Sequence, residues 1–422
     1  MVQNKTYENG LRLLHTQLPN VKSFTLMVYT MVGSREEEKE QEGLAHLLEH
    51  MFFKSTKNRN TMQVIDELEE LGSHNASTSK EATRFYISSL NTNAERCFDI
   101  ISDCYCNPLF KEEDLVTEKE TVCSEIDYYA DKHEETSYSN CFKLLFKNNP
   151  KLANDIIGSK STLRNATSDV LHAFHDKYYT TGRTIIATAG DIPFEKIDEL
   201  VVKYFLNNIK TCEPAVCYDD TKINADVEVN EYIFESRDTD QFYFFAGMQC
   251  ENEDNQTNLT LSLLNRIMGG SLSSRLSKSL REQHGLVYGV CTGGFNFRDI
   301  KLKYLDFMCG KENAQKALEL VKEVFEDMQK GNITQKELDL VKNSRKTELA
   351  LADERTTSLV YNMINEYLYK NRNYDINTTF EEIDAITLED VNKIAKDYFA
   401  NKKYSIGIVS KEDDINPLKI FE

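Results

Sequence analysis

Two histidines and a glutamate lie within five consecutive residues, His46-Leu47-Leu48-Glu49-His50, and zinc hydrolases are built from these residue types. The order is the inverse of the commoner HExxH motif. Residues four apart on an α-helix share one face, so a helix here would place the imidazoles of His46 and His50 side by side. Glu49 would stand beside them, within reach of an activated water without being a ligand. Spacing and residue type therefore predict a zinc site with a carboxylate base.

The alternative explanation is a solvated helix face that carries two incidental histidines. The neighbouring residues argue against it, because most of them are apolar and predict a buried helix. These apolar neighbours are Leu44, Leu47, Leu48, Met51 and Phe52. Ionisable groups on a buried helix need a partner, and a metal ion is a sufficient one. We therefore favour the metal site.

A third ligand must come from elsewhere in the chain, because catalytic zinc takes three protein ligands and keeps one position open. The acidic segment from about Glu112 to Asp131 reads as a helix. Within it, Glu118 and Glu125 lie two turns apart and share a face. Glu125 is the best candidate ligand, but spacing alone leaves a wet acidic surface as the more frequent explanation for either glutamate.

Three segments together resemble the pitrilysin and mitochondrial-processing-peptidase family of zinc metallopeptidases, in its short two-domain form. They are Gly43–Thr56, Leu71–Thr83 and Glu118–Ile126. In that family the third ligand is the second of two glutamates seven residues apart on a downstream helix, which corresponds to Glu125. The resemblance therefore implies one zinc ion per chain, held by His46, His50 and Glu125. It also implies that Glu118 orients a ligand.

The same resemblance gives Asn75 and Ala76 a role in binding substrate. They lie in Gly72–Glu81, which is similar to a family segment whose edge strand pairs with the substrate backbone. Small side chains at these two positions would let a peptide approach and add as a strand. The residues alone favour a polar turn before a strand at Thr83–Leu90. We expect His74 to be a polar residue at the start of the strand and not a ligand.

Arg281 and Tyr288 resemble an Arg/Tyr pair that relatives carry at the same spacing. The resemblance implies that the arginine holds a substrate carbonyl and that the tyrosine hydroxyl stabilises the oxyanion of the tetrahedral intermediate. Without the resemblance, these residues read as a helix that ends at Gly285, followed by a strand in which Tyr288 is packed. The functional role would add to that structure.

The elements that must position these residues occur twice. Thr167–Tyr179, followed by an apolar strand pattern, recurs 220 residues later as Thr387–Phe399, and each copy begins with a threonine suited to cap a helix. Helical stretches at about Ala94–Asp131 and Glu312–Glu354 also correspond. We therefore expect an α+β fold of two duplicated α/β sandwich domains, each with a mixed, largely antiparallel sheet covered by helices.

The predicted domain boundaries follow from this duplication. Residues 1–212 form the metal-binding catalytic domain, 213–226 a linker, and 227–422 a homologous domain that carries Arg281 and Tyr288. The second domain is expected to lack a metal site, because the helix that corresponds to the histidine helix carries neither the two histidines nor the glutamate. Aligning Leu47-Leu48 with Leu263-Leu264 places Ser262, Asn265 and Arg266 opposite His46, Glu49 and His50.

Composition restricts the partners and the compartment. A net charge of −19 argues against nucleic acid or an anionic membrane as a partner and is compatible with peptide substrates. No stretch approaches the ~18 unbroken apolar residues of a membrane helix. The first residues show neither an apolar signal core nor an Arg-rich presequence, so we expect a cytoplasmic protein. The 10 cysteines lack paired spacings and are expected to be reduced thiols.

Together these observations predict a zinc-dependent endopeptidase that hydrolyses peptides or short unfolded polypeptides, with water activated by zinc and Glu49 as general base. The resemblance implies a closed chamber formed by a homodimer, in which Arg281 and Tyr288 of one subunit serve the metal of the other. The alternative is a catalytically silent peptide-binding or structural subunit of a processing-peptidase-like complex. In such subunits the metal motif or the third glutamate is damaged, whereas here every matched position is present.

Overall fold

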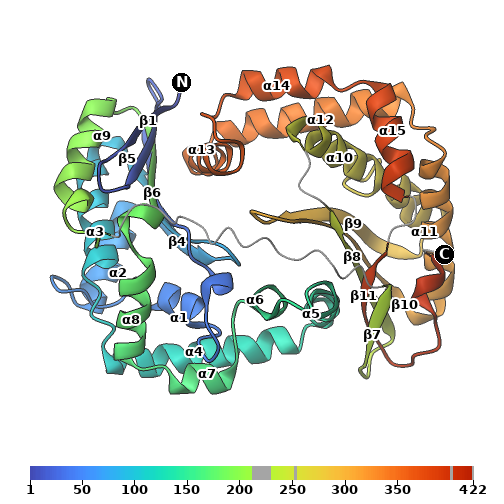
Figure 1. Ribbon diagram of the computed structural model, residues 1–422, viewed down its shortest axis with the longest axis horizontal. Coiled ribbons are helices and arrows are strands. Elements are labelled where there is room, and N and C mark those ends of the chain that lie inside the picture. Colours follow the sequence, from blue (N-terminus) through green and yellow to red (C-terminus); the bar gives the residue numbers. More distant parts are fainter. Residues whose placement is uncertain (212–229, 251–253, 400–402, 421–422) are drawn as a thin grey trace. The chain divides into compact units, whose positions relative to one another are not determined.

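The computed structural model describes residues 1–211, 230–250, 254–399 and 403–420 (Figure 1). Packing divides these residues into two compact units, each assembled from three chain segments. The first unit holds the described parts of Met1–Asp127, Asp155–Thr221 and Ala350–Asp375, and the second holds those of Tyr128–Asn154, Lys222–Leu349 and Ile376–Glu422. The linker predicted at 213–226 lies outside the described residues.

The first unit is built on a six-stranded sheet with the order β1-β2-β6-β3-β5-β4. Its strands are β1 (Gln3–Thr6), β2 (Arg12–Gln17), β3 (Ser23–Thr30), β4 (Ser73–Thr78), β5 (Thr83–Leu90) and β6 (Thr184–Gly190). Only β2 and β6 run parallel, and the other neighbours are antiparallel. This confirms the mixed, largely antiparallel sheet expected from the sequence, and β5 occupies the predicted range.

Helices cover both faces of this sheet. They are α1 (Leu44–Met51), α2 (Thr61–Leu71), α3 (Ala94–Cys106), α4 (Glu112–Ala130), α7 (Lys160–Asn165), α8 (Ser168–Tyr178), α9 (Phe194–Val201) and α13 (Thr356–Lys370), with short turns η1 (Ser34–Glu36), η2 (Asn91–Asn93), η3 (Thr181–Arg183) and η4 (Val202–Leu206). Successive residues of a strand point to opposite faces. On β3, Phe24 and Leu26 therefore enter the core shared with Phe98 of α3, while Thr25 faces α13.

The second unit contains five strands within the described residues, in the order β7-β11-β8-β10-β9. They are β7 (Glu231–Ser236), β8 (Gln241–Cys250), β9 (Val287–Asn296), β10 (Lys301–Gly310) and β11 (Ser405–Ser410). Its helices are α5 (His133–Leu145), α6 (Pro150–Ala153), α10 (Asn255–Met268), α11 (Ala314–Gln329), α12 (Gln335–Asp353), α14 (Ile376–Ala385) and α15 (Leu388–Phe399), with η5 (Ser277–Gln283), η6 (Lys311–Asn313) and η7 (Pro417–Ile420). The pair β7–β11 is parallel, as is β2–β6 in the first unit.

Each sheet is covered on one face by a helix from the other half of the sequence (Figure 1). In the first unit, α13 packs across β6 and β3, and the hydroxyls of Thr25 and Thr356 lie 2.8 Å apart. In the second unit, α5 packs on β11 and β8, and the Cys141 thiol donates to the Ser405 carbonyl at 3.0 Å. A Cβ on Gly407 would clash with a backbone oxygen of α5, so this close packing requires glycine.

The repeated helix and strand are present as predicted. Thr167 caps α8 by accepting from the Val170 amide, and Thr387 accepts from the Asp390 amide at the start of α15. These helices lead into β6 and β11, the two strands at equivalent places in the sheets. Each long helical stretch is two helices, α3 with α4 and α11 with α12. The duplicated two-domain α/β fold is confirmed.

Candidate metal centre

Helix α1 carries both histidines and is fixed at its start by a side chain from the preceding loop. Its N-cap residue, Gly43, adopts φ +94° and has no side chain to satisfy the first amides. The buried carboxyl group of Glu37 does so instead, accepting from the amides of Gly43 at 2.9 Å and Ala45 at 2.8 Å. The apolar side of α1, including Leu47 and Leu48, lies in the core. The helix is thus held on its buried side and at its N-terminus.

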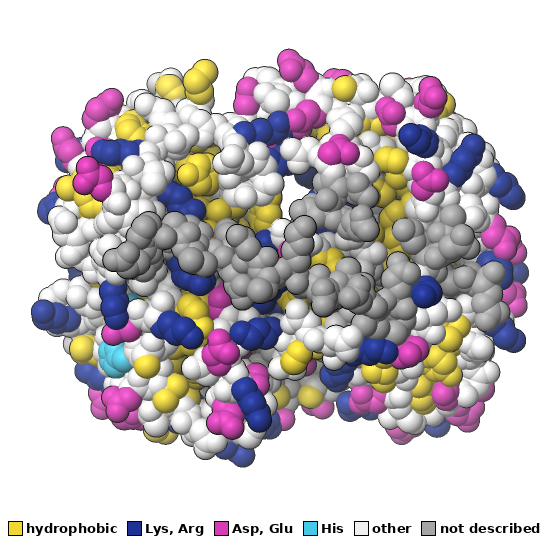
Figure 2. Space-filling view, in the orientation of Figure 1, with side chains coloured by type: hydrophobic (Ala, Val, Ile, Leu, Met, Phe, Trp, Pro, Cys, Tyr) yellow, Lys and Arg dark blue, Asp and Glu magenta, His cyan; other side chains and the backbone are white. Residues whose placement is uncertain are grey.

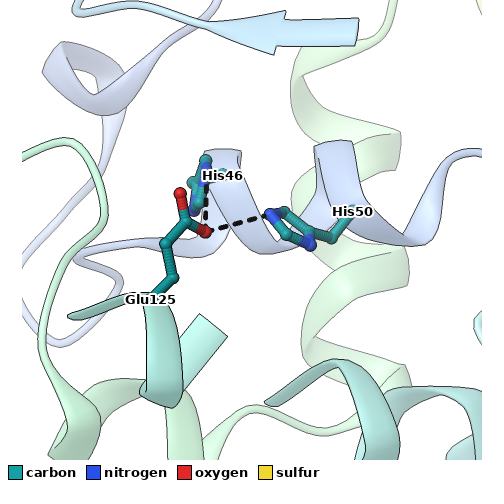
Figure 3. A group of neighbouring side chains, drawn as sticks. All are labelled: His46, His50 and Glu125. Carbon is teal, nitrogen blue, oxygen red and sulfur yellow. Dashed lines mark ion pairs between the residues drawn. The ribbon is translucent and has the colours of Figure 1, made fainter. Parts of the chain in front are cut away.

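The imidazoles of His46 and His50 and the carboxylate of Glu125 converge on one point (Figure 3). The Nε2 atoms of His46 and His50 lie 3.9 and 3.4 Å from the same oxygen, Oε2, of Glu125 on α4. Ligands of a tetrahedral zinc with bonds of about 2.0–2.1 Å are separated by about 3.3 Å. The donors all lie within 4.8 Å of one another, so the set fits a zinc ion once the side chains close in on it.

The tautomer of His50 is fixed by Glu118. A carboxylate oxygen accepts only, so the 3.2 Å contact between His50 Nδ1 and Glu118 Oε2 places the hydrogen on Nδ1 and leaves the Nε2 lone pair facing Glu125. Burial lowers the pKa of His50, but the Glu118 hydrogen bond and the charges of Glu49, Glu125 and Glu118 outweigh burial and raise it. The hydrogen bond from His50 Nδ1 to Glu118 is the kind of outer carboxylate contact that zinc-ligating histidines usually make.

His46 is a neutral ligand candidate over a wide pH range. Burial and, after it, the charge of His50 lower its pKa to about 4. Its Nδ1 atom is buried and has no hydrogen-bond partner within the described part of the chain. Its Nε2 atom faces Glu125, so the protein leaves the lone pair of His46 available to a metal.

Glu49 lies next to the three converging donors but is not one of them. Its Oε2 atom lies 4.0 Å from His46 Nε2 and accepts a hydrogen bond from the Thr78 hydroxyl at 3.1 Å. Burial raises the pKa of Glu49, which brings a carboxyl group closer to the range useful for proton transfer near neutral pH. Sequence reasoning did not single out Thr78, although it lies on β4 two residues beyond Ala76. Residues two apart on a strand share a face, and that was the available signal.

Strand β4 lies at the edge of the first sheet and packs beside α1. The segment is thus an edge strand, and the turn favoured by the residues alone is wrong. Asn75 is exposed and Ala76 half-buried. The Asn75 side chain accepts from the Ala76 amide at 2.9 Å. His74 lies near the strand start and is not among the three converging donors.

Arg281 and Tyr288 belong to the second unit. The helix η5 ends at Gln283, Gly285 adopts φ +62°, and β9 begins at Val287. The guanidinium of Arg281 lies 5.6 Å from the centre of the Tyr288 ring. The expectation that Tyr288 is packed in its strand is wrong, because the residue is 84% exposed. The pair is therefore presented to solvent by this chain.

In the second unit an ion pair takes the place of the metal donors. Glu348 is the fourteenth residue of α12, as Glu125 is of α4, and Arg266 is the counterpart of His50. The guanidinium of Arg266 contacts both carboxylate oxygens of Glu348, at 2.7 and 2.5 Å. The duplicated helices are thus joined by a bidentate ion pair where the first unit has the converging donors.

Several other expectations concern the rest of the chain. His15 is buried and bonded to Thr188 and to the Ile192 carbonyl, as expected for a packed histidine. Cys104 and Cys106 are free thiols.

Among the described residues, no helix combines the length and the apolar character needed to cross a membrane. On the face seen in Figure 2, acidic and basic side chains are interspersed.

Comparison with known families gives two matches that together span most of the chain. The family described as Insulinase (Peptidase family M16) matches residues 12–159, the part that contains all three converging donors. The family described as Peptidase M16 inactive domain matches residues 165–345. The second description agrees with the absence of the motif histidines from the repeated half.

Two relatives that span most of the chain agree with these matches, and one solved structure has a similar fold. A Bacillus subtilis protein, the uncharacterized zinc protease YmxG, is 28% identical over 97% of this chain and 98% of its own length. An uncharacterized zinc protease of Rickettsia felis is 30% identical over 82% of this chain and 83% of its own. A Helicobacter pylori protease has a similar fold, with a TM-score of 0.87 and 23% identity over 97% of this chain and 99% of that one.

Proposed function

This chain belongs to peptidase family M16, and from that membership we propose that it is a zinc-dependent endopeptidase acting on peptides or short unfolded polypeptides. The observation that supports the proposal best is the convergence of His46, His50 and Glu125 with Glu49 beside them. The two curated relatives described above are named zinc proteases, which favours zinc as the ion. We expect one ion per chain.

In this proposal each residue has a separate task. His46, His50 and Glu125 hold the ion, which when bound supplies the Lewis acidity that makes water a nucleophile near neutral pH. Glu118 orients His50. Glu49 takes a proton from water as the water oxygen attacks the scissile carbonyl carbon. It then delivers that proton to the amine nitrogen as the carbon–nitrogen bond breaks.

Substrate would be held by two further sets of residues. An extended peptide adds to the open edge of β4 at Asn75 and Ala76, where backbone hydrogen bonds give affinity without demanding a particular sequence. Arg281 and Tyr288 steady the carbonyl and its developing negative charge. We propose that they do so for the metal centre of the other subunit of a homodimer that encloses a chamber. The exposure of Tyr288 favours a role outside its own fold.

The first test combines metal analysis with cleavage of a quenched peptide library, with and without a chelator. Wild type should contain about one zinc per chain and show cleavage that the chelator abolishes. Glu49→Gln should keep its zinc and lose at least about 10²-fold in activity, the usual contribution of a general base. Glu120→Gln, on the exposed side of α4, is the matched control and should be unchanged.

Two other outcomes would contradict the proposal. Cleavage by Glu49→Gln at the wild-type rate would show that Glu49 is not the base. Zinc retained without cleavage of any peptide would support the catalytically silent peptide-binding or structural subunit instead.

The cytoplasmic location expected from the amino-terminal residues stays a prediction.

The homodimer is tested by mixing two inactive variants. In a dimer of one Arg281→Ala chain and one Glu49→Gln chain, one of the two active sites is intact. That site combines Glu49 of the first chain with Arg281 of the second. Recovery of activity on mixing would support the shared site. No recovery would count against it, provided that mixed dimers form.

A further inference from the structure

Lys54 makes an ion pair with the carboxylate that orients His50. Its ammonium lies 2.6 Å from Glu118 Oε1, while Oε2 of the same carboxylate lies 3.2 Å from His50 Nδ1. The Glu118 side chain is only 9% exposed. The chain Lys54–Glu118–His50 therefore runs from the loop after α1, through α4, and back to α1.

We propose that Lys54 is a positioning residue of the metal centre, acting through Glu118, and this proposal rests on the function proposed above. A carboxylate with one partner can turn about its bonds. Partners on both oxygens fix its plane, and the charged donor strengthens the contact. Glu118 held in this way keeps the hydrogen of His50 on Nδ1 and the Nε2 lone pair directed at the site shared with Glu125.

The backbone around Lys54 is held well enough for this task. Phe52, two residues earlier, is buried and stacks on Phe85 with ring centres 3.4 Å apart. Thr56, two residues later, is buried and donates to Asp103 at 2.5 Å. A lysine between two buried anchors loses less conformational freedom on forming an ion pair than a lysine on a free loop. Lys54 is itself only 25% exposed in its side chain.

No other lysine or arginine of the described chain lies within ion-pair distance of Glu118. Lys119 is the next residue along α4, but its ammonium is directed at the carbonyls of Arg164 and Ala166, at 3.3 and 2.5 Å. The positive partner of Glu118 is thus Lys54, and removing it leaves the buried carboxylate with His50 alone.

The duplicated half offers an independent comparison. The alignment that pairs His50 with Arg266 places Gly270 opposite Lys54, and the alignment of α4 with α12 places Val341 opposite Glu118. The half that lacks the two histidines therefore lacks the lysine and the orienting glutamate as well. Lys54 and Glu118 occur together with the metal donors, as expected if they serve them.

The test measures zinc affinity directly, by competition with a chromophoric chelator, in proteins whose folding is checked by circular dichroism. Glu118→Gln should weaken zinc binding about 10–100-fold, the usual effect of losing an outer partner of a ligand. Lys54→Met should weaken it about tenfold, at the lower end of that range, and Lys54→Arg should restore most of the affinity. Lys57→Met, an exposed lysine of the same loop, is the control and should bind as wild type.

The double variant decides whether Lys54 acts through Glu118. On the Glu118→Gln background, Lys54→Met should cost little further affinity, because interacting residues are not additive. An equal loss on both backgrounds, or wild-type affinity in Lys54→Met, would overturn the positioning role. A wild type that binds no zinc would refute the proposed function instead, so the two failures are distinguishable.

Discussion

The hydrogen bond from Thr78 to Glu49 leads to a prediction about the pH dependence of catalysis. The hydroxyl donates to Glu49 Oε2 at 3.1 Å, so it favours the ionised carboxylate. The base must be ionised to accept a proton from water, and the acid limb of kcat/KM reports its pKa in the free enzyme. Thr78→Val removes the donor and keeps the branched shape. We expect the acid limb to move to higher pH.

The size of the shift follows from the contact. A hydrogen bond to a charged group contributes roughly 1.5–3 kcal/mol. The Glu49 side chain is only 15% exposed, so water screens the contact little and the lower end of that range is a minimum. Since one pKa unit corresponds to about 1.4 kcal/mol, the limb should shift by at least about one unit. At pH values well above the acid limb, kcat/KM should change little, and at pH values below it kcat/KM should fall at least about tenfold.

The assay is the pH profile of kcat/KM on a quenched peptide, with zinc content measured for each protein. Thr78→Ser is the matched control, because it keeps the hydroxyl and loses only the methyl group. It should keep the wild-type limb. An unmoved limb in Thr78→Val, or an equal shift in Thr78→Ser, would refute the assignment of this hydrogen bond to the base.

Two further predictions concern stability in the second unit. Burial raises the pKa of Asp306 from 3.8 to about 6, so its contribution to stability is full below pH 3.8 and is lost as pH rises through 6. Asp306→Asn should therefore gain up to about 3 kcal/mol relative to wild type between pH 4 and 7, measured by urea unfolding; a constant difference would contradict this. Gly407→Ala should destabilise by about 1–3 kcal/mol, because its Cβ would clash with Ser137 of α5. An unchanged unfolding midpoint would show that α5 does not pack there.

The parts of the site that lie on one element could be predicted from the sequence. Helical periodicity alone put His46 and His50 on one face, and the predicted helix at Glu112–Asp131 differs from α4 by one residue at its end. The strand at Thr83–Leu90 was predicted with its observed bounds. These succeed because the repeat of a helix or strand fixes which residues share a face.

Some features were missed because they depend on packing between distant segments. No spacing rule indicates that the Lys54 ammonium reaches Glu118. Strand periodicity places Thr78 on the face of Ala76, but only the packing of β4 beside α1 brings the Thr78 hydroxyl to Glu49. The prediction that Tyr288 is buried was wrong for the same reason. Whether a strand residue is exposed depends on which other segments cover the strand. Periodicity along a segment carries no information about its neighbours.

Residue types and spacing were enough to place His46 and His50 together on one helix, to reveal the duplication and to show that the second half has no counterpart of these histidines. Glu125 was identified as the third donor only through the family resemblance. Three features are seen only in the folded chain. Glu125 Oε2 faces both Nε2 atoms, an Arg266–Glu348 ion pair replaces the donors in the other half, and α5 and α13 each cover the sheet of the opposite half. The difference is one of range, because the local geometry of a helix or strand follows from the bonds of that one segment. Contacts between segments far apart in the chain follow from how all the apolar faces are buried together.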